Sequence, residues 1–551
     1  MTTTTPTGTA APSAQGLFVR NATGLVRAWA TFDAFIYAFF SVNVVALAWY
    51  EYSYGPITSA KGNLITATIV SSVIILCEVV VYAGLISVIP RAGGDYVWQT
   101  RILGGGIGFV LAITGWVFIL WLWVPIYGAI LTVLFFAPLA TVMADWTGSH
   151  WWAQQAVNAT GDGGYMLSSV IVAGFAAVVI ALGMKVYARV QKFCFYGGML
   201  GLVSFFLLLL FADHGSFVSG FNHFSTHVFG VKGNAYAQTV VAAQKAGYSP
   251  IKFSSIAFVS SWVLIPLVLF FNLYPNWGAT LFGEVRGAGD FKKNLRAMGY
   301  ALTAAAVLAV LSLILITKVT TTSFYHDANF TFQSGTSVLP VWPYPDLLAA
   351  FVTTNHVLQL WLVLSLSLWF FGWAGTVFMS STRVIFAAAF DRALPERFAD
   401  VSKSGAPIVA LIAMLVPGLV LSYFYSYNIF HLRTATLDAV LVIAVTFLGS
   451  TIAAIILPWR MKRIYDASPV AKYQIAGIPV ITIAGVIFAA FLIWTIYEWL
   501  QWSVYGVNDR NSLIFIAVLY ALSVGIYIGS RLYRSRQGVN LSAVHAEIPV
   551  E

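Results

Sequence analysis

The sequence predicts an all-α membrane protein of about twelve transmembrane helices. Of the 551 residues, 59% are hydrophobic and only 9% are charged, whereas a soluble domain carries roughly a quarter charged residues. A helix that crosses about 30 Å of hydrocarbon needs roughly 20 apolar residues, and about twelve windows of the chain reach that length. The lipid bilayer is therefore the expected surrounding of most of the chain.

The predicted helices follow one another along the chain with polar connections between them. Several contain Gly, Ser, Asn and Thr, which permit close contact and hydrogen bonds between helices in a bundle. Their expected ranges are 29–50, 64–88, 107–139, 166–184, 193–212, 256–282, 297–316, 358–390, 408–425, 437–457, 475–499 and 512–532.

Lysine and arginine residues are segregated between alternate connections. If the N-terminus is cytoplasmic, 22 of the 29 Lys and Arg residues fall on the cytoplasmic side, as the positive-inside rule requires. One missed or invented helix would scramble this segregation. The sequence therefore predicts a multi-pass protein of the plasma membrane with both termini in the cytoplasm.

Several function classes do not fit this composition. The net charge of +9 does not indicate a nucleic-acid partner, because the basic residues form no continuous face. Cys77 and Cys194 have no CxxC or metal-ligand neighbour, and residues 1–15 lack the features of a signal peptide. We expect residues 1–28 to form a cytoplasmic tail.

Membrane enzymes are also disfavoured. A haem protein needs histidine pairs inside its spans, and a membrane hydrolase needs a nucleophile with a base or a metal cluster at matching depth. Neither pattern is present, so we expect no catalytic residue and no cofactor, and the sequence assigns no metal site. All eight histidines lie in predicted loops or near helix ends, namely His150, His214, His223, His227, His326, His356, His431 and His545.

Three segments on the predicted cytoplasmic side form a specific pattern. The first, residues 90–98, reads PRAGGDYVW and follows the second helix, where Gly93 and Gly94 permit a tight turn and close packing. The second, residues 282–286, reads FGEVR and ends the sixth helix. The third, residues 381–395, reads STRVIFAAAFDRALP and closes the eighth. In this order and spacing they resemble the amino acid-polyamine-organocation (APC) superfamily of permeases, over roughly residues 24–458.

The resemblance implies a leucine-transporter-like fold with two inverted repeats of five helices and two accessory helices. The repeats then cover residues 29–212 and 256–457, separated by an extracellular loop at 213–255. The accessory helices cover 458–532, and a cytoplasmic tail covers 533–551. The resemblance also implies secondary active transport of amino acids or related small organic molecules by alternating access.

The resemblance further implies a midplane substrate site where helices one and six are interrupted. The residues fit such interruptions, because polar residues lie midway in helix one and Pro275 removes a hydrogen bond in helix six. Freed N–H groups suit a carboxylate and freed carbonyls suit an ammonium. Alternatively, the polar residues only form hydrogen bonds between helices, and the proline only kinks its helix. Phe270 and Phe271 either form an aromatic gate over the ligand or only pack against other side chains. The expected substrate-binding residues are Ser41, Val42, Asn43, Val44, Phe270, Phe271, Asn272, Tyr274 and Asn276.

The sequence departs from the family at positions that matter. Many relatives carry Glu in place of Gly84, Gly in place of Tyr274, Glu in place of Asn276 and often Lys in place of Gly198. In proton-coupled relatives the lysine takes part in coupling, so an amine for that scheme is absent here. The missing acid in helix six makes neutral or zwitterionic amino acids more expected than polyamines. The departures also leave open a transporter-like subunit that acts as a receptor or scaffold in a membrane complex.

Ionisable residues inside the spans are coupling candidates, since each costs at least about 2.5–3.5 kcal/mol near the bilayer centre. Asp33 and Glu78 are candidates for binding a cation or relaying a proton. Alternatively, Asp33 pairs with Arg27 or another loop cation, and Glu78 stays protonated between helices. Sodium-coupled transporters of this architecture use hydroxyls of helix eight, although such groups commonly bond their own backbone. Sodium and protons therefore both remain candidates, with Thr376, Ser380 and Ser381 as the available hydroxyls.

Overall fold

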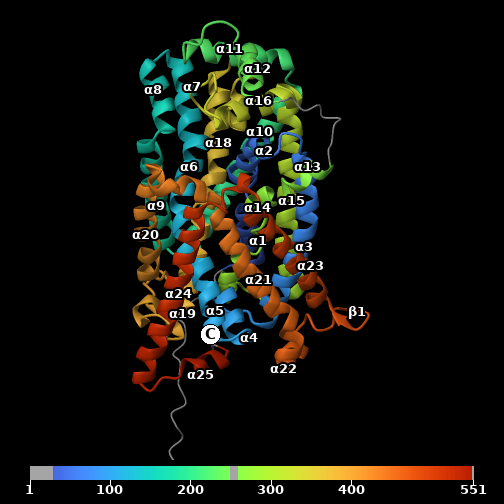
Figure 1. Cartoon of the computed structure of the whole chain (residues 1–551), viewed down its shortest axis with the longest axis vertical. Coiled ribbons are helices and arrows are strands. Elements are labelled where there is room, and N and C mark those ends of the chain that lie inside the picture. Colours follow the sequence, from blue (N-terminus) through green and yellow to red (C-terminus); the bar gives the residue numbers. More distant parts are fainter. Residues whose placement is uncertain (1–28, 249–257, 549–551) are drawn as a thin grey trace, which may run out of the picture.

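The computed structural model describes residues 29–248 and 258–548 as a tall bundle of helices (Figure 1). In these ranges twelve helical segments are long and apolar enough to cross a membrane, as predicted. We call the end that carries α8 (His150–Ala159), α11 (His214–His227) and α12 (Ala235–Lys245) the upper face. The opposite end, with α4 (Asp95–Ile102) and α25 (Leu541–Ala546), is the lower face.

The first six spans include three that consist of several helical pieces, some of them 3-10 or π-helical turns (η). Span one is α1 (Thr31–Ser41), η1 (Val44–Ala48) and α2 (Trp49–Thr58), and span two is α3 (Leu64–Val88). Span three joins α5 (Gly105–Ile113), η2 (Thr114–Phe118), η3 (Ile119–Leu122), α6 (Trp123–Leu131), η4 (Thr132–Phe136) and α7 (Ala137–Thr147). Spans four to six are α9 (Asp162–Ala181), α10 (Met184–Phe211), and α13 (Phe258–Trp262) with α14 (Ile265–Asn272) and η5 (Trp277–Glu284).

The last six spans are more regular. They are α15 (Phe291–Thr320), α18 (His356–Trp373) with α19 (Thr376–Phe390), α20 (Ile408–Ser426), η7 (Ile429–Ala435) with α21 (Thr436–Arg460), α23 (Val480–Gln501) and α24 (Arg510–Arg536). The connections hold α16 (Thr322–Gln333), α17 (Pro345–Ala350), η6 (Glu396–Ala399), α22 (Lys462–Asp466), η8 (Ser503–Tyr505), and a small hairpin of β1 (Gln474–Ile475) and β2 (Ile478–Pro479).

Span boundaries differ from the predicted windows where helices continue beyond the apolar stretch. Span two begins and ends as predicted, whereas the third helix runs to Thr147 rather than to residue 139. Hydropathy marks only the part of a helix that is apolar enough for lipid, so helical turns that enter the polar region are missed. The expected upper loops contain short helices for the same reason.

Four spans form the interior of the bundle. The most apolar windows of spans one, three, six and eight are 78%, 78%, 89% and 83% buried, whereas that of span twelve is only 17% buried. Within this arrangement α1 packs on α15, and α10 packs on α18. The two interrupted spans therefore lie inside protein, where non-helical backbone is tolerated in a membrane.

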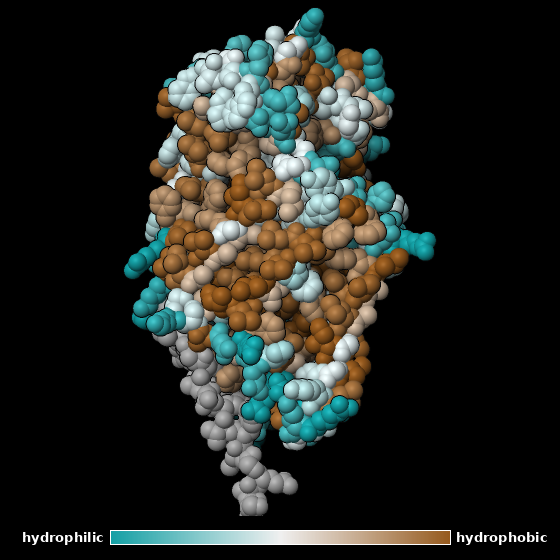
Figure 2. All heavy atoms as spheres, turned by 90° about the vertical axis from the view of Figure 1, so that its left-hand side faces the viewer, coloured by the Kyte–Doolittle hydropathy of each residue, from teal (hydrophilic) through white to brown (hydrophobic). Residues whose placement is uncertain are grey.

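A hydrophobic band crosses the middle of one side of the molecule (Figure 2). Figure 2 shows this band between two polar ends, on the side of the bundle formed by α9, α20 and α24. Such a band is the surface that a lipid bilayer covers. Exposed side chains on these three helices include Leu167, Val170, Val178, Ile412, Val416, Val420, Leu513, Ile514, Val518 and Leu522.

The three motif segments meet at one place, which we call the lower contact. The N–H of Gly93, a residue with φ of 90°, donates to the carbonyl of Thr280 at 2.8 Å. A Cβ added to Gly93 would lie 2.4 Å from the Cβ of Ala387, so only glycine fits there. The guanidinium Nε of Arg383 donates to Oε1 of Glu284 at 2.8 Å, and both side chains are at most 2% exposed.

The C-terminal helix α25 covers the connection between spans two and three. The hydroxyl of Tyr96 lies 3.2 Å from Nε2 of His545, and Arg101 Nε donates to the carbonyl of Glu547 at 3.1 Å. Arg101 also forms a buried ion pair with Asp391 at 2.5 Å. The end of the chain is thereby joined to the ends of spans two and eight.

Candidate functional site

The first span is interrupted midway. Helix α1 ends at Ser41, and Val42 (ψ 68°) and Asn43 (ψ 118°) leave the helical conformation before η1 begins. The Oδ1 of Asn43 accepts a hydrogen bond from the N–H of Ala46 at 2.8 Å, and its Nδ2 donates to the carbonyl of Trp369 at 2.9 Å. An asparagine cap therefore stabilises the break.

The sixth span is interrupted at residues 273–276, between the end of α14 and the start of η5. Pro275 lies in this segment and has no N–H to donate. The Nδ2 of Asn272 donates to the hydroxyls of Ser71 at 2.7 Å and Ser72 at 3.0 Å. Asn272 therefore fixes the upper half of span six to α3.

A small cavity brings the two breaks together. Its volume is about 10 Å³, close to the smallest cavity that admits a water molecule. Ser41 comes from the first break and Tyr274 and Trp277 from the sixth, and no charged side chain belongs to the lining. The six lining residues are at most 3% exposed and are Ser41, Trp123, Tyr274, Trp277, Trp373 and Val377.

Unsatisfied polar atoms gather around the break in span six. Among the described residues, the hydroxyls of Tyr274 and Thr280, both side-chain polar atoms of Asn276 and the indole N–H of Trp277 have no hydrogen-bond partner, although all are buried. Buried polar groups are normally hydrogen-bonded. A bound polar molecule would satisfy them.

An aromatic layer lies next to the cavity. The ring of Phe270 stacks on Trp123 at 5.4 Å and on Tyr50 at 5.9 Å between centroids, and Tyr50 contacts Trp342 at 5.4 Å. Phe270 is thus placed as an aromatic cover beside a cavity-lining tryptophan. Phe271 is fully buried and takes part in none of the ring contacts found in the described part of the chain.

The predicted residues differ in what they present. Ser41 and Tyr274 line the cavity. Asn276, which precedes the lining residue Trp277, has a side-chain amide without a hydrogen-bond partner among the described residues. Val42 and Val44 are fully buried on either side of Asn43, so only their backbone can face a polar ligand. The side chains of Asn43 and Asn272 are engaged in holding the breaks.

The two acidic candidates have different surroundings. Asp33 pairs with Lys192 at 2.7 Å and its Oδ2 accepts from the N–H of Ala30 at 2.9 Å, while Arg27, the expected partner, lies outside the described residues. Glu78 is fully buried, and neither carboxylate oxygen has a hydrogen-bond partner among the described residues. One turn further along α3, Tyr82 donates to Oδ1 of Asp95 at 2.6 Å.

The helix-eight hydroxyls already have protein partners. Ser380 donates to the carbonyl of Trp277 at 2.9 Å and lies 2.7 Å from the hydroxyl of Tyr37. Thr376 donates to the carbonyl of Trp373 at 2.8 Å, and Ser381 donates to its own helix at Val377. Of the three hydroxyls, only that of Ser380 joins span eight to spans one and six, whereas those of Thr376 and Ser381 donate within span eight.

Several residues at the site were not predicted from the sequence. Trp123 and Trp373 line the cavity from spans three and eight, and no local pattern marks them as lining residues. Glu51 is a buried acid with one unpaired carboxylate oxygen. It was missed because the predicted window ended at Tyr50, whereas the helical span continues to Thr58.

The comparisons agree with this architecture. The fold resembles that of MhsT, solved in complex with L-phenylalanine, with a TM-score of 0.53 and 15% sequence identity, covering 84% of this chain and 98% of that chain. None of the curated proteins matches the chain. The twelve spans thus adopt a leucine-transporter-like fold. The family pattern described as amino acid permease matches residues 32–524. The protein is therefore a membrane transporter that belongs to the amino acid permease family.

Proposed function

We propose that the protein is a secondary active transporter of neutral amino acids in the plasma membrane, with its lower face in the cytoplasm. The observation that carries the proposal is the meeting of two helix breaks at a closed cavity, which must widen to admit an amino acid and beside which Tyr274 and Trp277 keep unpaired polar atoms. Half-helix ends and freed backbone groups suit the carboxylate and ammonium of an α-amino acid. The uncharged lining favours a neutral side chain.

Asn276 is the residue we assign to substrate polar groups. Its side-chain amide supplies donors and an acceptor, and none of these has a partner among the described residues. The hydroxyl of Tyr274 and the indole of Trp277 are unpaired beside it. A substrate that forms these hydrogen bonds removes a desolvation penalty of about 1–3 kcal/mol for each group.

Alternating access is supported by barriers on both sides of the cavity. Phe270, stacked on Trp123 and Tyr50, lies toward the upper face, and the Glu284–Arg383 pair lies toward the lower face. We propose that the lower contact opens while the aromatic layer stays closed, and that the aromatic layer opens while the lower contact stays closed. The substrate site is then accessible from only one side of the membrane at a time.

We propose the proton as coupling ion and Glu78 as its carrier. A buried carboxylate without a hydrogen-bond partner is stable in its neutral form and needs a partner when it ionises. The candidate sodium ligands Thr376, Ser380 and Ser381 each donate to a backbone carbonyl, which is the ordinary role of hydroxyls in helical spans, so nothing in their bonding requires an ion. The proposed proton route leads from Glu78 to Tyr82, one turn further along α3, and on to Asp95, which accepts a hydrogen bond from Tyr82.

Uptake into proteoliposomes tests the function. Radiolabelled neutral amino acids are offered with proton and sodium gradients imposed separately, and Asn276→Leu is compared with the wild type. We expect uptake driven by the proton gradient and more than tenfold slower uptake by the variant. Binding without uptake by the wild-type protein would instead favour a receptor or scaffold.

The coupling role has its own test. Glu78→Gln keeps the shape of the side chain and removes its proton exchange, so uptake should lose its dependence on pH while exchange of internal for external substrate continues. Glu498→Gln, near the end of α23, is the matched control and should behave as the wild type. Unchanged pH dependence in Glu78→Gln would discard the proton role.

A further inference from the structure

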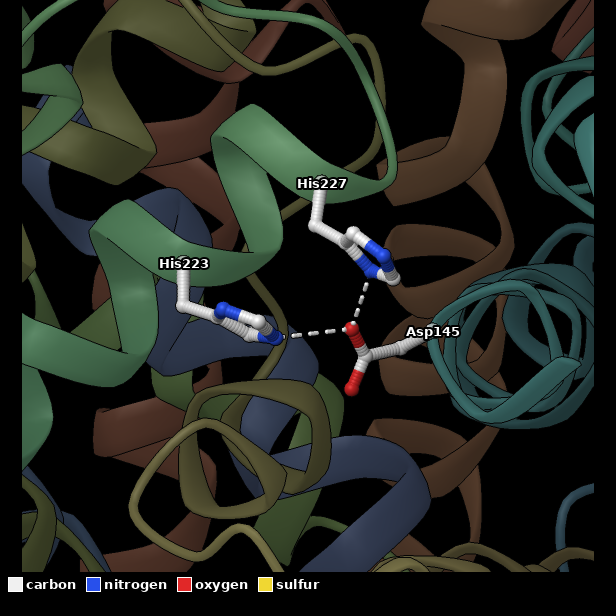
Figure 3. A group of neighbouring side chains, drawn as sticks. All are labelled: Asp145, His223 and His227. Atoms are coloured by element: carbon white, nitrogen blue, oxygen red, sulfur yellow. Dashed lines mark hydrogen bonds and ion pairs between the residues drawn. The ribbon is translucent and has the colours of Figure 1, made fainter. Parts of the chain in front are cut away.

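A cluster of histidines surrounds a buried carboxylate at the upper face. Asp145 in α7 has a side chain that is only 2% exposed. Its Oδ1 lies 3.1 Å from Nε2 of His223 and 2.9 Å from Nδ1 of His227 (Figure 3). Nδ1 of His356, at the start of α18, lies 3.7 Å from the other carboxylate oxygen. The three histidines and the carboxylate thus join three separate helices.

The charge of Asp145 has no permanent counter-charge. In the described part of the chain its ion-pair partners are His223, His227 and His356, and no lysine or arginine pairs with it. A buried carboxylate normally pairs with a cation or coordinates a metal. An imidazole carries a positive charge only when it is protonated, so the site has no permanent positive centre.

The donor set and its spacing suit a transition-metal ion. His223 and His227 are four residues apart on α11, which places both rings on one side of the helix, and the rings are nearly parallel at 19°. The ligand atoms of Asp145, His223 and His227 all lie within 4.8 Å of one another. In a tetrahedral zinc site with bonds of about 2.1 Å, ligand atoms lie roughly 3.4 Å apart, so small side-chain rotations suffice.

Access to the site is open on one side. The side chains of His223 and His227 are 55% and 49% exposed, whereas the carboxylate between them is buried. An ion can therefore enter from water and meet a charged oxygen that is shielded from solvent. His356 is held by stacking on Trp146 at 5.8 Å and by Oε1 of Gln359 at 3.1 Å from its Nδ1.

We propose that Asp145, His223 and His227 form a zinc-binding site at the upper face, with water or His356 as the fourth ligand. Two imidazole nitrogens and one carboxylate oxygen form a ligand set suited to zinc and unsuited to magnesium or calcium, which take oxygen ligands. The ion fastens α11, part of the connection between spans five and six, to the end of α7. The site is separate from the substrate cavity and does not depend on the proposed substrate.

Direct zinc binding tests the proposal. The full-length protein is purified in detergent without a histidine tag, stripped with EDTA and titrated with ZnCl2 by calorimetry. His223→Gln/His227→Gln is the first variant, because glutamine can still donate a hydrogen bond to Asp145 but is a poor zinc ligand. Asp145→Asn removes the charge and keeps the shape. His431→Asn is the control, because His431 is an exposed residue of η7 with φ of 56°, a conformation that asparagine tolerates.

The expected result is one zinc ion per wild-type chain and the same binding in His431→Asn. Both cluster variants should lose more than about 100-fold in affinity, because removal of an outer-shell partner alone costs about 10–100-fold. Elution of each variant as a monodisperse peak in size-exclusion chromatography shows that it is folded. Equal zinc binding by wild type and His223→Gln/His227→Gln, or displacement of zinc by equimolar magnesium, would overturn the site.

Discussion

The buried pair of Glu284 and Arg383 gives the sharpest stability prediction. The two side chains are 2% and 1% exposed, and the guanidinium makes a second contact with the carboxylate, Nη2 to Oε2 at 3.3 Å. Glu284→Gln leaves the guanidinium charge buried without a carboxylate. Removal of one partner of a buried pair costs about 3–5 kcal/mol, a large share of a typical unfolding free energy of about 5–15 kcal/mol.

The measurement is the free energy of unfolding in mixed micelles with increasing SDS, for Glu284→Gln, Arg383→Met and the double variant. We expect the double variant to lose less than the sum of the single losses, with a coupling of about 1–3 kcal/mol. Glu396→Gln is the control, because Glu396 is 61% exposed and lies 3.4 Å from Arg534. Exposed pairs contribute about 0–1 kcal/mol.

Strictly additive losses, or a loss for Glu284→Gln no larger than that of the control, would refute this reasoning. Such results would mean that the pair is solvated during unfolding measurements or is not formed in the stable state. The lower contact would then depend on Gly93 and its neighbours alone.

Three further predictions concern other parts of the molecule. Tyr274→Ala should enlarge the cavity and lower the free energy of unfolding by about 3 kcal/mol, and added substrate should raise the melting temperature of this variant less than that of wild type, because the hydroxyl proposed to bind the substrate is lost. Gly93→Ala should reduce stability and uptake, since its Cβ would meet Ala387 at 2.4 Å, and Gly93→Ala/Ala387→Gly should recover part of both. Burial raises the pKa of Asp327, outside the spans, to about 7 from 3.8. The folded state therefore binds the proton more tightly, and stability decreases as pH rises from about 4 to 7. Between pH 4 and 7 the melting temperature of Asp327→Asn should fall less steeply than that of wild type. Parallel curves of melting temperature against pH would show that Asp327 is not the source of this pH dependence.

The sequence alone was sufficient for the spans and the positions of both breaks. Apolar length reports directly on lipid contact, and Pro275 marks span six because it cannot donate a backbone hydrogen bond. The convergence of Gly93, Glu284 and Arg383 was not derivable from spacing, since it depends on how distant helices pack. Their motif pattern nevertheless led to the family.

Side-chain roles inside the bundle were less predictable. Asn43 looked like a substrate ligand, but its amide is engaged by Ala46 and Trp369. The tryptophans at 123 and 373 have the composition of any apolar span, and only the fold brings them to one cavity. The cluster around Asp145 joins α7, α11 and α18, which lie far apart in the sequence, beyond the reach of any local pattern.

The position of α25 has a consequence for biosynthesis. Tyr96 and Arg101 emerge from the ribosome about 450 residues before their partners His545 and Glu547, as their sequence separations of 449 and 446 show. Because chains insert from the N-terminus onward, Arg101 and the neighbouring spans are in the membrane before residues 545–547 exist to cover this arginine. Assembly of this end of the transporter is completed only after those residues have been synthesised.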